Sequence, residues 1–512
     1  QQPCRTELLT DWRRQKKKLY IPQMMRARMA RTIQALPQPF SLAMRQQPGQ
    51  APIVIIGEER KRHMNLLKVV AAFHPVRLHL GLGQRWQQHA REQTDNRHHY
   101  QQFHKGKTRF FGAFRHVRGY SAISCMIAIR QRFPNASAMK TAAAVLHEME
   151  RPMPYADSRP MVIEELDLDG PGEGEVLVEV KGAGLCHSDL SVINGSRPRQ
   201  TPMVLGHEAS GIVREVGTGV RGLKPDDHVI FTFIPSCDYC RYCKEGKPSL
   251  CEPGAEANNA GVLMNGAQRS SNKGRSYFHH CGVSGYSQYT IALPGSLVKI
   301  DSTLPFEYAT LFGCAVMTGT GAAMNTANIR PNQTVAVFGL GGVGLAALMG
   351  AKACNAGQII AVDLLNSKLE MAKKLGATHT VNAKESNPVE VIKDLTHGGV
   401  DIAIESAGNA TVLAQAYEST MRGGTTIAIG LPHPDHKLSI PAVTLSAMEK
   451  TIKGSYQGSC VPTRDIPKFI DMYHAGQLPV DQLLTDTISL EDINTGFDRL
   501  HKGEVARQVI LF

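Results

Sequence analysis

The chain has 512 residues, 42% of them hydrophobic, which is enough for two or three domains with cores of their own. Its net charge of +12 is uneven: residues 1–138 contain 25 Lys and Arg against 6 Asp and Glu, and the rest has 32 against 39. The longest apolar runs are shorter than the ~20 residues of a membrane span, and no secretory signal pattern is present. Eleven cysteines are too sparse for a secreted disulfide scaffold, which favours a reducing compartment, the cytoplasm.

Residues 1–138 are rich in Gln, Arg and His and show no sustained helical or strand period. We assign no fold to this basic leader and expect it to be disordered. The alternative is a nucleic-acid-binding arm, because Lys and Arg neutralise phosphates and aromatic rings stack on bases. The run from Met139 to Leu146 reads like a natural start that continues into a first strand, which favours the leader interpretation.

The pattern of predicted secondary structure changes once in the remaining chain. From Met161 it shows short β-rich segments, such as Glu175–Val180, between Gly, Pro and Asp turns. Beyond Thr334, predicted strands alternate with predicted helices: Val335–Phe338, Val343–Asn355, Ile359–Val362 and Lys368–Leu375. This alternation predicts an α/β fold with a doubly wound parallel sheet. The tail, Arg507–Phe512, is expected to return to the β-rich part as a strand.

A glycine-rich loop follows the strand at Val335–Phe338 and opens a predicted helix; it comprises Gly339, Leu340, Gly341, Gly342, Val343 and Gly344. In a dinucleotide-binding loop the first of these glycines permits the turn, Gly341 lets the backbone approach the pyrophosphate, and Gly344 allows close packing of helix on strand. Asp363 ends the next strand, where a carboxylate accepts hydrogen bonds from a ribose 2′-OH and repels a 2′-phosphate, so NAD is favoured over NADP. Lys368 is a second ribose candidate, or else a solvated helix lysine.

Two sets of residues have the spacing and chemistry of metal ligands. Cys237, Cys240, Cys243 and Cys251 form a compact Cys4 loop that is typical of a structural zinc site, with an iron–sulfur cluster as the alternative. The second set is dispersed, and consists of Cys186, His207 and Cys314. Two cysteines and one histidine leave a zinc position open for water or substrate, which indicates a catalytic site.

With these motifs in this order, Met139–Phe512 resembles the medium-chain zinc-dependent alcohol dehydrogenases, including the liver-type and class III (glutathione-dependent formaldehyde dehydrogenase) branches. The segment His279–Tyr289 belongs to the resemblance. It implies a GroES-like β-rich catalytic domain at 139–315 and 456–512, and a Rossmann NAD-binding domain at 316–455. It also implies two zinc ions per subunit and a homodimer or homotetramer.

The resemblance implies a role for each residue at a matching position. Cys186, His207 and Cys314 would hold the catalytic zinc, with Glu208 close behind it, and Asp189 would orient His207. His187 and Arg507 would lie near the coenzyme pyrophosphate. Phe233, Tyr286 and Leu431 would line the substrate pocket, or else be ordinary core residues.

The implied reaction is zinc-assisted hydride transfer from an alcohol to NAD, with the Ser188 hydroxyl carrying the proton away. Ser191 stands where liver-type enzymes have the histidine that ends this proton relay, so the last proton step stays open. The alternatives are a class III enzyme acting on S-(hydroxymethyl)glutathione, a zinc-free quinone or enoyl reductase, which the two metal sites oppose, and nucleic-acid binding by the leader.

Overall fold

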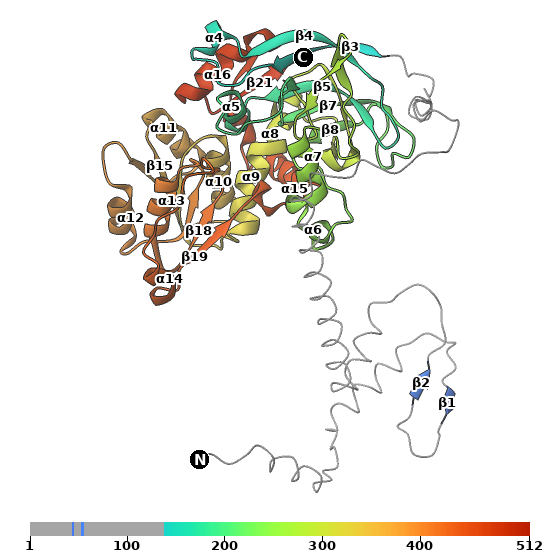
Figure 1. Ribbon diagram of the computed structural model, residues 1–512. Coiled ribbons are helices and arrows are strands. Elements are labelled where there is room, and N and C mark those ends of the chain that lie inside the picture. The colour runs from blue at the N-terminus through green and yellow to red at the C-terminus, as the bar shows by residue number, and fades with distance from the viewer. Residues whose placement is uncertain (1–42, 46–52, 56–137) are drawn as a thin grey trace, which may run out of the picture. The chain divides into compact units, whose positions relative to one another are not determined.

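The computed structural model describes residues 43–45, 53–55 and 138–512 (Figure 1). Within the unit formed by residues 1–122, β1 (Ala43–Arg45) pairs with β2 (Ile53–Ile55) in antiparallel fashion. Two predictions were made for residues 1–138: a disordered leader and a nucleic-acid-binding arm. Except for the β1–β2 pair and Ala138, this segment lies outside the described residues. Everything below concerns the unit that contains residues 138–512.

Two mainly antiparallel sheets are built from both ends of this unit. The first has the order β10-β9-β4-β3-β6-β11, with β3 Met139–Leu146, β4 Met161–Leu168, β6 Met203–Val204, β9 Ser270–Asn272, β10 Arg275–Ser276 and β11 Phe278–His279. The second has the order β13-β8-β7-β5-β21-β20, and β12 also pairs with β5. Its strands are β5 Val176–Gly184, β7 Ala209–Val216, β8 His228–Phe231, β12 Tyr289–Ala292, β13 Leu297–Ile300, β20 Leu484–Ile488 and β21 Arg507–Leu511.

The third sheet is wholly parallel, with the strand order β16-β15-β14-β17-β18-β19. Its strands are β14 Thr334–Phe338, β15 Gln358–Asp363, β16 His379–Asn382, β17 Val400–Glu405, β18 Thr420–Ala428 and β19 Thr451–Gly454. The chain starts in the middle, moves to one edge and then crosses to the other, which is the order of doubly wound dinucleotide-binding sheets. The crossover helices are α10 Gly342–Ala353, α11 Asn366–Leu375, α12 Pro388–Thr396, α13 Ala410–Glu418 and α14 Val443–Ala447.

The other helices surround the two β-rich sheets or connect them to the parallel sheet: α4 Tyr155–Ser158, α5 His187–Ile193, α6 Arg241–Lys244, α7 Glu252–Ala260, α8 Phe306–Leu311, α9 Met317–Gly321, α15 Pro462–His474 and α16 Ile493–Lys502. Two π-helical turns, Phe312–Val316 and Ala322–Thr326, flank α9. Short 3-10 turns lie at Pro248–Leu250, Pro294–Ser296, Gln457–Ser459, Val480–Leu483 and Leu490–Asp492. No helix in the part of the chain that the structure describes is long and apolar enough to cross a membrane.

The elements of the parallel sheet gather on one side of this unit, and α9 and α15 lie where they meet the β-rich sheets (Figure 1). One hydrophobic core crosses this boundary, because Ile230 of β8 and Phe312 belong to the same buried cluster as Val335 of β14 and Phe469 of α15. The β-rich part and the parallel sheet are therefore packed against each other.

The α/β fold with a doubly wound parallel sheet was predicted correctly, and the individual elements agree to within a few residues. The strand expected at Ile359–Val362 spans Gln358–Asp363, and the helix expected at Val343–Asn355 spans Gly342–Ala353. The C-terminal strand, β21, does return to the β-rich part, where Val509 pairs with Gly184 of β5. The domain limits 139–315, 316–455 and 456–512 stay a prediction.

Lys368 connects the parallel sheet to the chain segment ahead of β21. Its side chain on α11 is 7% exposed, and its Nζ donates a hydrogen bond to the Val505 carbonyl at 2.5 Å. Burial lowers the pKa of Lys368 to about 8; among nearby charges Asp363 raises this pKa and Arg507 lowers it. The solvated alternative is thus wrong, and in this structure the amine is committed to a backbone carbonyl.

The low pKa of Lys368 predicts a pH-dependent stability. Between the folded value of about 8 and the ordinary value of 10.5, the unfolded chain binds more protons, so the free energy of unfolding rises with pH and the gain is lost as pH falls through 8. The slope from this group is at most about 1.4 kcal/mol per pH unit. We expect Lys368→Met to remove this rise, as measured by urea unfolding of both proteins at about pH 7.5 and about pH 9.5. An equal pH response in both would contradict it.

Candidate functional site

Three chain segments converge on the predicted open metal site. Cys186 directly precedes α5, His207 lies in the loop between β6 and β7, and Cys314 lies in the π-helical turn Phe312–Val316. Their donor atoms and a carboxylate oxygen of Glu208 all lie within 4.8 Å of one another, and the Cys314 Sγ is 3.4 Å from the His207 Nε2. Because thiolate and imidazole donors at such spacing suit a tetrahedral Zn²⁺, the residues fit the metal that the sequence predicts.

Asp189 lies behind His207, on the side away from the thiols. Its buried Oδ2 is 2.9 Å from the His207 Nδ1, a charge contact that is not aligned as a hydrogen bond. The carboxylate is itself held in place, since it accepts hydrogen bonds from the Tyr286 hydroxyl at 2.9 Å and from the Gly206 N–H at 3.3 Å. This arrangement directs the Nε2 of His207 toward the two thiols, as the expected positioning role of Asp189 requires.

The placement of Tyr286 in the substrate pocket is wrong in this structure. Its side chain is fully buried, does not line the cleft, and its hydroxyl also lies within hydrogen-bond distance of the Gly184 carbonyl, at 3.1 Å. The sequence pattern could not distinguish a pocket aromatic from a core aromatic. Tyr286 belongs instead to the support of Asp189.

Burial and nearby charges shift the acidities of the candidate ligands. Burial alone would lower the pKa of His207, but the Asp189 carboxylate and the Cys186 thiolate raise it well above its usual range. A hydrogen bond with Cys314 lowers the pKa of Cys186 despite its burial, and the same contact together with burial raises the pKa of Cys314. A divalent cation bound here would displace the proton from both sulfurs, because the thiolate is the form that binds metal.

Glu208 is a buried carboxylate without a hydrogen-bond partner in the described part of the chain. Both of its oxygens are shielded from solvent, and the nearest cation is the Nε of Arg507, 3.9 Å from Oε1. Burial raises the pKa of Glu208 to about 7, and the Arg507 guanidinium opposes this rise. An orphaned carboxylate at this position is an observation that independently fits a cation among these donors.

The Cys4 loop forms a second, separate cluster. The donor atoms of Cys237, Cys240, Cys243 and Cys251 lie within 4.8 Å of one another, in the chain that joins β8 to α7. Backbone N–H groups point at two of the sulfurs: Cys240 donates to the Cys237 Sγ at 3.2 Å, and Gly254 donates to the Cys251 Sγ at 3.4 Å. Four thiolates with no open position fit a structural zinc.

A cleft of about 540 Å³ connects the open metal site to the glycine-rich loop. It is lined by most of the predicted residues: Cys186, His187, Ser188, His207, Phe233, Cys314, Gly339, Gly341, Gly342, Val343, Asp363, Leu431 and Arg507, and also by Ser191. Glu208, Asp189 and Gly344 lie behind its walls, and Lys368 does not line it. The hydroxyl of Ser191 donates to the His187 carbonyl at 2.8 Å.

The far end of the cleft has the features of a pyrophosphate site. Gly341 caps the N-terminus of α10, and a Cβ built at Gly342 would lie 2.4 Å from the Nε of Arg507. This buried Nε has no hydrogen-bond partner in the described part of the chain. A helix N-terminus, a glycine that admits close approach and an unsatisfied guanidinium together fit the two phosphates of a dinucleotide. Asp363 accepts hydrogen bonds from the backbone N–H groups of Leu340, Leu364 and Leu365.

Several residues that line the cleft were missed by the sequence reasoning: Arg197, Arg199, His280, Cys281, Thr318, Tyr456 and Gln457. The signal for the two arginines was present, since Arg197-Pro198-Arg199 follows the helix that bears Ser188 and Asp189. His280 could be placed only by the fold, which brings its Nδ1 to 3.4 Å from the Asp189 Oδ1.

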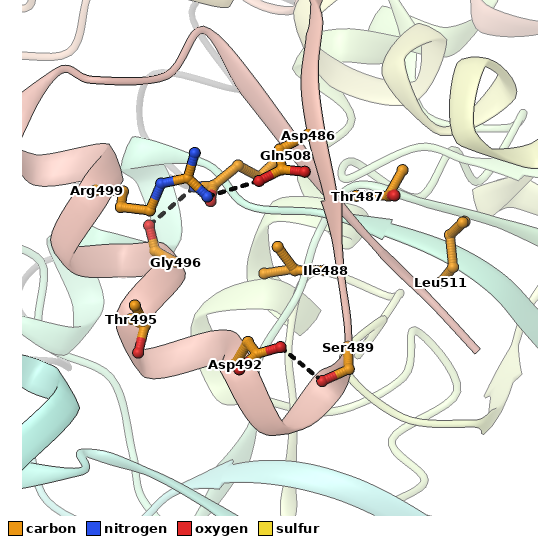
Figure 2. Close-up of a pocket in the computed structure, with 10 residues that line it drawn as sticks. All are labelled: Asp486, Thr487, Ile488, Ser489, Asp492, Thr495, Gly496, Arg499, Gln508 and Leu511. Atoms are coloured by element: carbon orange, nitrogen blue, oxygen red, sulfur yellow. Dashed lines mark hydrogen bonds and ion pairs between the residues drawn. The ribbon is translucent and has the colours of Figure 1, made fainter.

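A second hollow, of about 430 Å³, lies between β20, β21 and α16 and shares no lining residue with the cleft (Figure 2). Arg499 donates to Asp486 at 2.7 Å, so these two charges neutralise each other. Gln508 donates to the Gly496 carbonyl, and Ser489 donates to Asp492. It contains neither metal-ligating nor nucleophilic groups that converge, and we assign no activity to it.

The fold and the two clusters define a zinc-binding dehydrogenase, and family comparisons agree. Residues 172–302 match the alcohol dehydrogenase GroES-like domain, and residues 342–475 match the zinc-binding dehydrogenase domain. The chain belongs to the medium-chain, zinc-dependent alcohol dehydrogenase family.

Relatives cover the described unit almost completely. The chain is 40% identical over 377 residues to a putative alcohol dehydrogenase D of Mycobacterium tuberculosis, which spans 73% of this chain and 100% of the relative. It is 39% identical to a class-3 alcohol dehydrogenase of Drosophila melanogaster, over 69% of this chain and 95% of that one. The crystal structure of benzyl alcohol dehydrogenase from Acinetobacter calcoaceticus matches with a TM-score of 0.69 and 33% identity, over 73% and 99% of the two chains.

Two glycines of the loop predict separable effects on folding and on coenzyme binding. A Cβ at Gly341 meets nothing within 4 Å, so Gly341→Ala should fold normally but should weaken NADH binding about tenfold or more, because the new methyl group occupies the approach to the pyrophosphate. A Cβ at Gly344 would lie 1.9 Å from the Gly339 carbonyl oxygen, so Gly344→Ala should lower the unfolding temperature even without coenzyme. NADH fluorescence titration and thermal unfolding measure the two effects. A loss of stability in Gly341→Ala equal to that in Gly344→Ala would contradict this assignment.

Proposed function

We propose that this chain catalyses the reversible oxidation of primary and secondary alcohols to aldehydes or ketones, with NAD as hydride acceptor and zinc as catalytic metal. The observation that carries the proposal is the open set of sulfur and nitrogen donors, Cys186, His207 and Cys314, at one end of a cleft whose other end is a dinucleotide loop. The family to which the chain belongs performs this class of reaction.

When bound by Cys186, His207 and Cys314, zinc supplies a Lewis acid that favours loss of the alcohol proton, and NAD supplies the hydride acceptor. The protein residues contribute orientation and exclusion of water. Asp189 fixes the ring of His207, and the Phe233 ring packs edge-on against that imidazole with centroids 5.5 Å apart. Phe233 and Leu431 supply apolar surface on which the carbon chain of an alcohol can pack.

The proton of the alcohol needs an exit from this buried site. Ser188 lies two residues after Cys186 and also lines the cleft, so its hydroxyl can accept that proton and pass its own toward solvent. Ser191 lies one helical turn further on, but its hydroxyl is engaged with the His187 carbonyl. We therefore propose that the path ends at water or a ribose hydroxyl rather than at Ser191.

The coenzyme is proposed to lie along the glycine-rich loop. The pyrophosphate would be held by the N-terminus of α10, Arg507 and His187. The carboxylate of Asp363 would accept a hydrogen bond from a ribose hydroxyl group. A carboxylate at this position also repels the extra phosphate of NADP, which supports the choice of NAD.

A class III activity on S-(hydroxymethyl)glutathione is the nearest alternative, and a dehydrogenase of that name from Escherichia coli is 37% identical over 378 residues. Turnover of simple alcohols beside that of the glutathione adduct separates the two.

We further propose that the protein is a homodimer or homotetramer. We also propose the cytoplasm as its compartment, because the cysteines in the described part of the chain are all free thiols.

Zinc content and activity should respond differently to the two cysteine clusters. We expect two zinc ions per wild-type chain, and one in both Cys186→Ala and Cys240→Ser, because each variant loses a ligand from one cluster. Cys186→Ala should lose at least about a thousandfold in alcohol oxidation, whereas Cys240→Ser should chiefly lose thermal stability. The measurements are metal analysis, NADH formation and thermal unfolding.

Cys354→Ala is the matched control, since this partly buried cysteine at the end of α10 belongs to neither cluster. It should keep two zinc ions and wild-type turnover. Retained alcohol oxidation in Cys186→Ala would overturn the catalytic assignment.

A further inference from the structure

Two arginines lie on the cleft wall and take no part in the reaction proposed above. Arg197 and Arg199 follow α5, and both line the cleft together with Cys186, His207 and Cys314. Arg197 donates to the Leu431 carbonyl at 2.6 Å, and Arg199 donates to the Asn259 side-chain oxygen at 3.2 Å. The Nε of Arg199 is buried and has no hydrogen-bond partner in the described part of the chain. Each guanidinium therefore keeps donors that are not used within residues 138–512.

These two side chains differ from the other arginines of residues 138–512 because they are partly buried and have no carboxylate partner. Seven arginines there lie within 4.0 Å of a carboxylate: Arg151, Arg214, Arg241, Arg269, Arg464, Arg499 and Arg507. Five others have no such partner but are exposed to solvent: Arg159, Arg221, Arg275, Arg330 and Arg422. Among the described residues, only Arg197 and Arg199 are both partly buried and without a carboxylate.

The cleft offers them no internal counter-ion. Among the residues that line it, Asp363 is the one with a carboxylate, and it lies at the nucleotide end, bound to three backbone N–H groups. Burial lowers the pKa of Arg197, as expected for a cation with incomplete solvation. Two partly desolvated guanidinium groups on one wall create a positive potential that a bound anion would neutralise.

We infer that Arg197 and Arg199 bind an oxyanion on the alcohol substrate, so that the preferred substrates are alcohols with a carboxylate or phosphate group at the end remote from the hydroxyl. This inference rests on the proposed alcohol oxidation and names its substrate class. The guanidinium fork matches the geometry of both oxyanions. The carbinol carbon gives its hydride to NAD, the hydroxyl proton leaves to solvent, and the anionic group stays unchanged.

The contact between Arg197 and Leu431 suggests a competing, purely structural role. It joins a loop of the β-rich part to the segment after β18, and both residues line the cleft. If the arginines only held the cleft together, their loss would change the turnover of every alcohol by the same factor. The ratio of anionic to neutral substrate is therefore the informative quantity.

The test compares the full-length, zinc-loaded enzyme on matched substrates at saturating NAD. Each ω-hydroxycarboxylate of a length series is measured beside the unbranched alcohol of equal length, and ω-hydroxyalkyl phosphates form a second arm. We expect kcat/KM for the best anionic substrate to exceed that for its neutral counterpart about tenfold or more. The better arm identifies carboxylate or phosphate as the bound group.

Variants assign this preference to the two side chains. Arg197→Gln and Arg199→Gln should each lower the ratio of anionic to neutral kcat/KM about tenfold to a hundredfold, the effect of losing one charge-assisted hydrogen bond. Arg199→Glu should shift the preference toward ω-amino alcohols. Arg275→Gln, on the exposed strand β10, is the matched control and should leave the ratio unchanged.

Three results would overturn the inference. One is a wild-type enzyme that oxidises neutral and anionic alcohols equally well; another is an equal loss on both substrates in the arginine variants; the third is a matching loss of NADH affinity, which would assign the arginines to the coenzyme. All three leave alcohol oxidation intact. Failure of the zinc-loaded wild type to oxidise any alcohol would instead overturn the proposed function.

Discussion

The site depends on holding two sulfurs and one imidazole together in a space from which water is largely excluded. Cys186, His207 and Cys314 come from a helix start, a loop and a π-helical turn, and each is at most 5% exposed. A π-helical turn within α-helical chain is a local departure from the most stable hydrogen-bond pattern, and such departures concentrate at functional positions. Here the π-helical turn carries Cys314, so the irregular backbone occurs at a residue whose thiol must point toward the other metal ligands.

Positioning of the imidazole relies on a chain of buried polar groups. Tyr286 and the Gly206 N–H hold Asp189, and Asp189 faces His207. A buried carboxylate is costly unless several donors satisfy it, so these contacts stabilise both the charge and its direction. The close fit at Gly206 follows from the same constraint, since a Cβ there would lie 2.6 Å from the Tyr286 backbone nitrogen. The geometry of one ligand, His207, thus depends on residues from three separate segments of the chain.

The two cysteine clusters differ in exposure, and their proposed roles explain the difference. In the Cys4 loop the neighbouring Tyr239 is 65% exposed, and three of the four cysteines are only partly buried. Four thiolates complete the coordination of a zinc ion, so that ion needs no protection from water. An open position, in contrast, must admit an alcohol while water is kept away from the developing charge, which requires walls from both the β-rich part and the parallel sheet.

Contiguous motifs could be predicted from the sequence, and features that depend on packing could not. The Cys4 loop and the glycine loop each form within a few residues, so their spacing alone indicates the chemistry. The dispersed set of Cys186, His207 and Cys314 was recognised because two cysteines and one histidine are the ligands of an open zinc site. The Cys4 loop and the dinucleotide loop in the same chain supported this interpretation. Tyr286 and Lys368 show the limit: both lie in the expected segments, but only the fold determines that one supports Asp189 and the other contacts Val505.

The positive charges along the cleft would orient both the coenzyme and the substrate, which no single sequence motif indicates. Arg507 and the N-terminus of α10 present positive charge beside the loop at Gly341, and Arg197 and Arg199 present it on the wall that begins at α5. A dinucleotide carries its negative charge on the pyrophosphate, so the first group of donors would orient the coenzyme. The second group would orient a substrate by the same physics, with the hydroxyl end at the three metal ligands. Two separate positive regions along one cleft would thus align two ligands, because each anion can be neutralised fully in only one position.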